Sequence, residues 1–181
     1  MERVVGYIDG FNLYFGLKAS NWQRYYWLNL QLLLGNLLKP KQQLTFTKYF
    51  TSRVSYPSDK QKRQSIFIEA LETLDDFNIY YGKFQANPRR CTRCGYKDMI
   101  PNEKMTDVNI AVEMMMDAFQ DRFDTALLIS ADSDLSAPIK SIRNLFPQKK
   151  IVIAFPPQRH SVELSKQAHA TFTLGRANLA K

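Results

Sequence analysis

Histidine and cysteine are scarce in this chain, with two residues of each type among 181. None of the four lies near the acidic segments described below, so the sequence does not indicate catalysis by a Cys–His nucleophile. Glycine is also sparse, with seven residues, and no glycine-rich phosphate-binding loop is present. A low cysteine content fits a protein of a reducing compartment.

Long apolar runs are missing as well. Residues 28–38 (LNLQLLLGNLL) are interrupted by Asn, Gln and Gly, and they fall far short of the ~20 residues of a membrane span. The apolar run near the N-terminus is too short for a signal peptide. Without internal repeats or low-complexity segments, the sequence predicts a cytoplasmic protein with no membrane contact and one domain covering residues 1–181.

Acidic residues are outnumbered, because 25 Lys and Arg stand against 17 Asp and Glu and give a net charge of +8. Such an excess favours a polyanionic partner, most simply nucleic acid, with an anionic membrane surface as the second choice. Arg89, Arg90 and Arg93 are the basic group that we expect to contact RNA, because their loop leads into an acidic helix. A solvated surface is the alternative. Arg159 is expected either to reach a phosphate or to help cap the last helix.

Apolar strands alternate with amphipathic helices along the chain. Strands are expected at 3–8, 44–51, 79–84, 125–130, 151–155 and 171–174, and the main helices at 58–77, 106–119, 135–146 and 161–168. A further helical stretch covers 11–38, with a break near 20–21. This order predicts an α/β fold with a mainly parallel sheet of five to six strands, covered by helices on both faces. A polar, cysteine-containing loop at about 85–103 is expected to be an insertion.

Carboxylates follow two of the predicted strands and begin one helix. Asp9 ends the first strand, and Asp132 and Asp134 follow the most apolar strand, TALLIS. Asp107 begins a helix whose apolar stripe it heads, whereas Glu113 and Asp117 are expected nearer the solvent. Ligands bind at the carboxyl ends of strands in open α/β sheets, so these acids are expected to converge in one crevice.

Converging carboxylates need a partner, because two of them ~4 Å apart repel by about 4 kcal/mol at an effective dielectric constant near 20. A hard divalent cation such as Mg²⁺ or Mn²⁺ removes this repulsion, and it can also activate a water for attack on a phosphodiester. The structural alternative is that each Asp is a turn residue or a helix cap. Asn12 likewise either begins a helix or contacts the waters of a metal or a phosphate.

Three short motifs point to a known family. Asp9-Gly10-Phe11-Asn12, residues 103–107 (EKMTD) and residues 130–134 (SADSD) resemble the NYN domains, LabA-like members of the PIN-like ribonuclease superfamily. The resemblance implies a Rossmann-like, three-layer PIN-type fold and metal-dependent cleavage of RNA. The resemblance also implies that the catalytic metal ligands are Asp9, Asp107, Asp132 and Asp134. The supporting polar residues that it implies are Asn12, Lys104, Ser130 and Ser133. The family usually has Gly at position 131, and it often has Gly-Val at Met105-Thr106.

The expected function is therefore a Mg²⁺- or Mn²⁺-dependent ribonuclease, an endonuclease on single-stranded RNA. The alternative is a non-catalytic RNA-binding or adaptor module with the same fold. The aromatic segment 22–27 (WQRYYW) either stacks on unpaired bases or packs in a core or dimer interface.

The cysteine pair is a separate question. Cys91 and Cys94 resemble one knuckle of a zinc ribbon, but a structural zinc needs four ligands and the chain offers one such pair. A zinc shared between the subunits of a homodimer and a hairpin turn with free thiols both remain open.

Overall fold

Six parallel strands form the central sheet of the computed structural model, which describes residues 1–54, 57–90 and 92–179. The strand order is β3-β2-β1-β6-β7-β8, and every neighbouring pair is parallel. The strands are β1 (Glu2–Asp9), β2 (Gln42–Thr51), β3 (Phe77–Tyr81), β6 (Thr125–Ile129), β7 (Lys150–Phe155) and β8 (Ala170–Thr173). This confirms the predicted α/β fold with a mainly parallel sheet.

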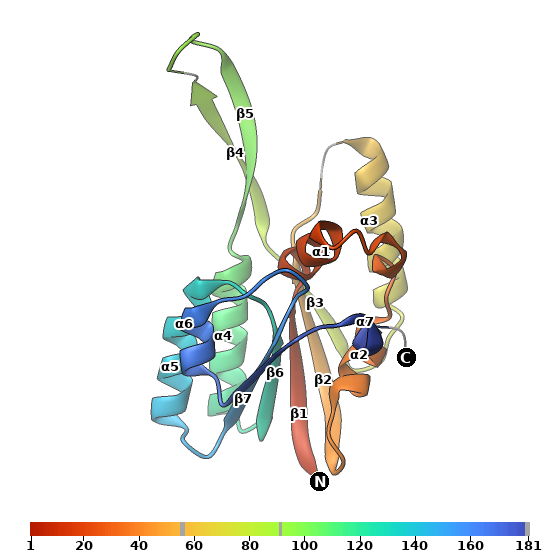
Figure 1. Cartoon of the computed structure of the whole chain (residues 1–181), viewed down its shortest axis with the longest axis vertical. Helices are drawn as coiled ribbons and strands as arrows, with labels where there is room; N and C mark the ends of the chain where they lie inside the picture. The colour runs from red at the N-terminus through yellow and green to blue at the C-terminus, as the bar shows by residue number, and fades with distance from the viewer. Residues whose placement is uncertain (55–56, 91, 180–181) are drawn as a thin grey trace.

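Helices cover both faces of the sheet (Figure 1). One face carries α4 (Thr106–Phe119), α5 (Ser136–Leu145) and α6 (Val162–Gln167). The other carries α1 (Gly10–Ala19), α2 (Leu30–Leu37), α3 (Ser58–Leu71) and α7 (Arg176–Leu179). Short 3₁₀ turns, η1 (Gln23–Tyr25) and η2 (Ser133–Leu135), complete the described elements.

Alternation along β1 divides the core into two layers. Val4 and Ile8 pack with the cluster under α1 and α2, whereas Val5 and Tyr7 pack with the cluster under α4 and α5. Successive side chains of a strand point to opposite faces, so a strand that is buried on both sides is apolar throughout. Asp9 is the last residue of β1, and it places a buried carboxylate where this apolar strand meets α1.

Residues 83–104 form an arm that rises beyond the carboxyl edge of the sheet (Figure 1). The arm is an antiparallel pair of strands, β4 (Lys83–Arg90) and β5 (Lys97–Lys104), and it is separate from the main sheet. The prediction of a loop here was wrong, and so was the continuous strand over 79–84, which divides at Gly82. A Cβ at Gly82 would lie 2.6 Å from both the Lys104 carbonyl oxygen and the Ser52 Oγ, so the base of the arm requires glycine.

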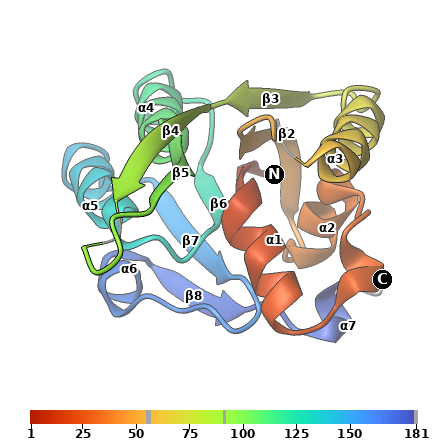
Figure 2. The same cartoon turned by 90° about the horizontal axis from the view of Figure 1, so that it is seen from above.

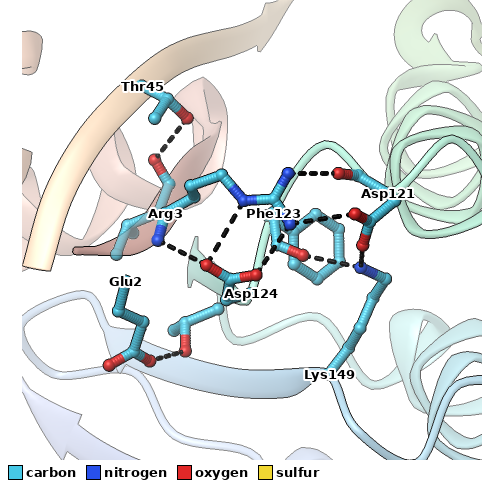
Figure 3. A network of polar contacts seen from close by, with 9 residues as sticks. Glu2, Arg3, Thr45, Asp121, Phe123, Asp124 and Lys149 are labelled. Atoms are coloured by element: carbon cyan, nitrogen blue, oxygen red, sulfur yellow. Dashed lines mark hydrogen bonds and ion pairs between the residues drawn. The ribbon is translucent and has the colours of Figure 1, made fainter.

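Acids at the opposite, amino-terminal edge of the sheet are paired with cations (Figure 3). The Arg3 guanidinium lies 2.7 Å from a carboxylate oxygen of Asp124 and 3.1 Å from one of Asp121. Lys149 Nζ lies 2.7 Å from the other oxygen of Asp121 and donates to the carbonyl of Phe123. Arg3 lowers the pKa of Asp124 to about 2 through these hydrogen bonds. This network therefore stabilises the ionised carboxylates.

No helix in the described part of the chain has both the length and the apolar character needed to cross a membrane.

Candidate metal centre

Asp9 is buried at the junction of β1 and α1, with a residue exposure of 3%. Its carboxylate accepts hydrogen bonds from the backbone N of Asn12 (3.0 Å), from Asn12 Nδ2 (2.8 Å) and from Ser130 Oγ (2.9 Å). Asp9 is thus the N-cap of α1, as the structural alternative proposed. Burial raises the pKa of Asp9, although these hydrogen bonds oppose the shift. A carboxylate can accept about four hydrogen bonds, which leaves room for one more contact.

Ser130 connects Asp9 to the second acidic segment. Its hydroxyl donates to Asp9 and accepts from the backbone N of Asp132 at 3.1 Å. Asp132 Oδ1 in turn accepts from the backbone N of Asp134 at 2.9 Å and caps η2. The end of β6 therefore turns in a fixed way, and this turn brings Asp132 and Asp134 to the carboxyl edge of the sheet.

Asp107 is carried by the first turn of α4, which Glu103 holds in place. Glu103 Oε1 accepts from the backbone N of Thr106 (3.3 Å), from Thr106 Oγ1 and from Ser52 Oγ (3.1 Å). Met105, between them, adopts a left-handed backbone with φ of 79°. The chain thus makes a sharp turn from β5 into α4, directly before Asp107.

Three carboxylates meet in this region. One oxygen from each of Asp107, Asp132 and Asp134 lies within 4.8 Å of the other two. Burial raises the pKa of Asp107 to about 7, helped by the negative charges of Asp132, Asp9, Glu103 and Asp134. Among the residues that the structure describes, no Lys or Arg forms an ion pair with any of the three. This cluster differs in that respect from the paired acids at the opposite edge.

The geometry of the cluster suits a hard cation. Mg²⁺ binds oxygen ligands at about 2.1 Å in an octahedron, so two of its ligands are separated by at most about 4.2 Å. Carboxylate oxygens within 4.8 Å of one another can reach that spacing with small side-chain movements. Carboxylates favour Mg²⁺ or Mn²⁺ over softer metals. Asp9 lies outside this group of three, and its negative charge still contributes to the raised pKa of Asp107.

Asn12 and Arg159 border the cluster. Asn12 Oδ1 accepts from the backbone N of Ala131 (3.3 Å) and from Arg159 Nη1 (2.8 Å). Gly16 brings the loop before Arg159 close to α1, because a Cβ there would lie 2.8 Å from the Pro157 carbonyl oxygen. Capping of α6 is performed by Ser161, whose Oγ accepts from the backbone N of Leu164. Arg159 is therefore not the residue that caps α6.

The remaining predicted residues lie around this centre or on the arm. Lys104 and Ser133 are exposed, and so are Arg89, Arg90 and Arg93, which belong to the arm and its tip. Cys94 is an exposed free thiol, whereas Cys91 lies outside the described residues, so the zinc prediction remains a prediction.

Sequence reasoning missed two features of this site. Glu103 belongs to the EKMTD motif, and the motif predicted no role for it. The aromatic side chains of α1 were not predicted as a group either, although Tyr14 and Phe15 follow Phe11 by three and four residues, which is a helical spacing.

The comparisons with known proteins agree with this fold. The protein 6-hydroxy-3-succinoylpyridine 3-monooxygenase HspA of Pseudomonas putida (strain DSM 28022 / S16) is 25% identical over 173 residues, which cover 76% of this chain and 54% of that protein. The chain thus spans about half the length of this curated relative. A crystal structure of a protein of unknown function from Vibrio parahaemolyticus RIMD 2210633 matches with a TM-score of 0.62 and 17% identity over 96% of this chain and 93% of that one, which shows the shared fold.

The family model described as "NYN domain" matches residues 3–175, nearly the whole chain. NYN domains are part of the PIN-like nuclease superfamily. The match includes all three acidic motifs and the strands that carry them. This chain belongs to the NYN domain family.

Proposed function

We propose that the protein is a Mg²⁺- or Mn²⁺-dependent ribonuclease that cuts single-stranded RNA internally. The observation that carries this proposal is the group of three carboxylates, within 4.8 Å of one another and without a cationic partner among the described residues. Uncompensated charges of one sign are costly unless an ion or a ligand joins them. Membership of the NYN family supports a nuclease as the class of enzyme.

The basic arm supports RNA as the substrate. Residues 83–104 contain six Lys and Arg and two Asp and Glu, so they contribute +4 to the net charge of +8. Figure 1 shows the arm rising from the carboxyl edge of the sheet, the edge at which β1 ends in Asp9 and β6 leads to Asp132. In this proposal its exposed arginines bind the phosphate backbone, which dominates the affinity of proteins for nucleic acids.

In the proposed site, Asp107, Asp132 and Asp134 hold the cation. Asp9 fixes Ser130 and Asn12 by hydrogen bonds and adds negative charge beneath the group. Lys104 and the arm arginines neutralise the phosphates on either side of the cleaved bond. A cation bound there would supply a water of lowered pKa and stabilise the charge that develops on phosphorus. Cleavage of this kind leaves a 5′-phosphate and a 3′-hydroxyl.

Two other functions compete with this proposal. A non-catalytic RNA-binding module would keep the arm and have no use for unpaired, partly buried acids. The monooxygenase activity in the name of the Pseudomonas relative belongs to a protein of which this chain spans about half, at 25% identity. The acid cluster and the basic arm favour hydrolysis of a polyanion over both alternatives.

The test incubates the purified protein with end-labelled single-stranded RNA in Mn²⁺, in Mg²⁺ and in EDTA. We expect cleavage that requires the cation and yields 5′-phosphate ends. Asp132→Asn should lower the rate by about 100-fold or more, because it removes one charge from the metal group. Asp75→Asn is the matched control, since Asp75 is an exposed acid that lies before β3, at the opposite edge of the sheet.

Equal cleavage by wild type and by Asp132→Asn would show that the activity comes from a contaminant or from another centre. Binding of RNA without cleavage in any cation would instead support the non-catalytic module.

A further inference from the structure

The exposed face of α1 carries three aromatic side chains that the metal centre does not use. Phe11, Tyr14 and Phe15 follow one another at helical spacing, and we call them the α1 platform. Tyr14 is 38% exposed and Phe15 is 44% exposed. The rings of Phe11 and Phe15 are nearly parallel, with centroids 6.2 Å apart and an interplanar angle of 26°. Aromatic rings that form a contiguous patch on a surface are typical of a binding site, whereas single exposed rings are not.

Neighbouring rings extend the α1 platform in both directions. Phe84 at the base of the arm meets Phe11 edge to face, with centroids 5.7 Å apart. At the other end the Tyr14 ring lies 5.0 Å from that of Tyr26, which follows η1. A continuous row of aromatic rings therefore leads from the base of the arm past α1. Seen from above, the arm and α1 lie on either side of β6, the strand that precedes Asp132 (Figure 2).

A cavity of about 360 Å³ opens beside the α1 platform. It is lined by Phe15, Ala19, Ala131, Gln158, Arg159 and His160. This volume is at the lower end of the range for small-ligand sites, about 300–1,000 Å³. The guanidinium carbon of Arg159 lies 5.9 Å from the centre of the Phe15 ring, within the range of a cation–π contact. The cavity thus combines an aromatic face with the Arg159 guanidinium, which a hydrogen bond to Asn12 holds in place.

The cavity is connected to the acids by short contacts. Ala131, which lines it, directly precedes Asp132 and donates its backbone N–H to Asn12. Arg159 donates to the same Asn12 oxygen, and Asn12 in turn donates to Asp9. A nucleotide in this cavity would therefore sit next to the carboxylate group.

We propose that the α1 platform and this cavity bind the unpaired bases of the RNA next to the cleaved bond, with one base stacked on Phe15 beside Arg159. The inference rests on the proposed function and specifies its substrate class, RNA whose bases are free to stack. Charge complementarity between the arm and the phosphates places the backbone, and aromatic rings accept any base because every base has a π-face. Paired RNA keeps its bases stacked inside the helix and cannot use the α1 platform.

The experiment measures binding without cleavage. Asp132→Asn serves as the background, and fluorescence anisotropy gives its affinity for a labelled single-stranded RNA of ten nucleotides. A second RNA of the same length has abasic nucleotides throughout. Adding Phe15→Ala should weaken binding of the intact RNA by about 5- to 150-fold, the effect of losing one stacked base. The abasic RNA should bind both proteins equally, and Phe15→Trp should restore the affinity for the intact RNA.

Two controls separate stacking from general damage. Phe119→Ala removes a ring that is 79% exposed at the end of α4, away from the acids, and it should leave binding unchanged. The dependence of affinity on salt should stay the same in Phe15→Ala and become weaker in Arg89→Gln/Arg90→Gln, because phosphate contacts set that slope.

If Phe15→Ala weakened the binding of intact and abasic RNA equally, or weakened neither, the proposal that bases stack on the α1 platform would be overturned. So would a change of oligomeric state in Phe15→Ala without an effect on RNA, which would make this face a contact between copies of the chain. Cleavage by the wild-type protein in Mn²⁺ is measured separately. If the wild type fails to cleave, the ribonuclease proposal fails while the binding data still decide whether the bases stack.

Discussion

Met105 has a strained backbone at a position where the resemblance to NYN domains implies that glycine is common. Its φ of 79° lies in the left-handed region, which costs a residue with a Cβ roughly 1–2 kcal/mol. The Met105 side chain is 47% exposed and adds little packing in return. The turn is maintained because Glu103 and Thr106 bond across it. The departure from the family pattern at this position therefore costs conformational energy that glycine would not.

Met105→Gly should make the protein more stable. Glycine adopts this conformation without a steric penalty, so we expect the free energy of unfolding to rise by about 1 kcal/mol, less the entropy that glycine loses on folding. Urea denaturation followed by circular dichroism measures the change. Met105→Ala is the control, since it removes the side chain and keeps the strain. Equal stability of the two variants would contradict a backbone origin.

Single residues also show how far the sequence could predict this site. Asp9, Asp107, Asp132 and Asp134 were chosen because each stands where an apolar element ends or begins, and a parallel sheet brings such ends to one edge. The special geometry of Met105 and the capping by Glu103 depend on a turn between the arm and α4. Local sequence gave no indication of that turn, because Met rarely adopts a positive φ.

At the level of elements, β2 and α4 are joined by a buried ion pair that the sequence did not predict. Lys48 Nζ lies 2.6 Å from a carboxylate oxygen of Asp117 and 2.7 Å from one of Glu113. Asp117 also accepts from Tyr7 Oη at 2.6 Å, and it is 1% exposed. Burial and the charge of Asp117 hold the pKa of Tyr7 well above its usual range, so its phenol stays protonated and donates. The prediction that Asp117 lies toward the solvent was wrong.

Lys48→Met should destabilise the protein strongly, by about 3–5 kcal/mol, because it leaves the buried Asp117 carboxylate with Arg122, at 3.6 Å, as its one cationic partner among the described residues. Lys48→Met/Asp117→Asn should recover more than half of that loss, since Asn is neutral and still accepts from Tyr7. Thermal and urea unfolding measure both variants. A double variant as unstable as the single one would mean that Lys48 acts through packing and not through charge.

The arm illustrates the other limit of sequence reasoning at this scale. Its strands were expected as a loop because residues 83–104 show no alternation of apolar and polar side chains. That alternation arises when one face of a strand packs on a core, and the arm forms a separate two-stranded sheet that stands off the main one. The central strands are buried on both faces, and their continuous apolar runs predicted them to within a few residues.

Over the whole molecule, charge is arranged unevenly between the two edges of the sheet. Acids at the amino-terminal edge are paired with Arg3 and Lys149, whereas the carboxyl edge gathers Asp107, Asp132 and Asp134 without such partners among the described residues. The positive charge on this side is carried by the exposed arginines of the arm. A polyanion is attracted to the arm, and a cation is attracted to the acids. Both ligands are therefore drawn to the same edge of the sheet.

This arrangement predicts how stability depends on pH without metal. The folded-state pKa of Asp107, about 7, is above its ordinary value of 3.8, so the folded protein holds a proton that the unfolded chain releases. The stabilising contribution of Asp107 is complete below pH 4, and it is lost as the pH rises through 7. Asp107→Asn should not show this loss of stability, because its amide does not titrate. In EDTA it should therefore gain stability relative to wild type as the pH increases from 4 to 8, as measured by urea unfolding.

A divalent cation should oppose this loss of stability at high pH, because the metal and the proton compete for the Asp107 carboxylate. With a pKa near 7, most Asp107 is protonated at pH 6, and the affinity for Mn²⁺ should be about tenfold lower there than at pH 8. Mn²⁺ should accordingly raise the melting temperature of the wild type more at pH 8 than at pH 6, and it should leave Asp107→Asn nearly unchanged at both. Titration calorimetry in two buffers of different ionisation enthalpy would count the released proton. Mn²⁺ binding that is independent of pH and releases no proton would show that Asp107 is not a ligand, and the cation site would have to be sought elsewhere on the protein.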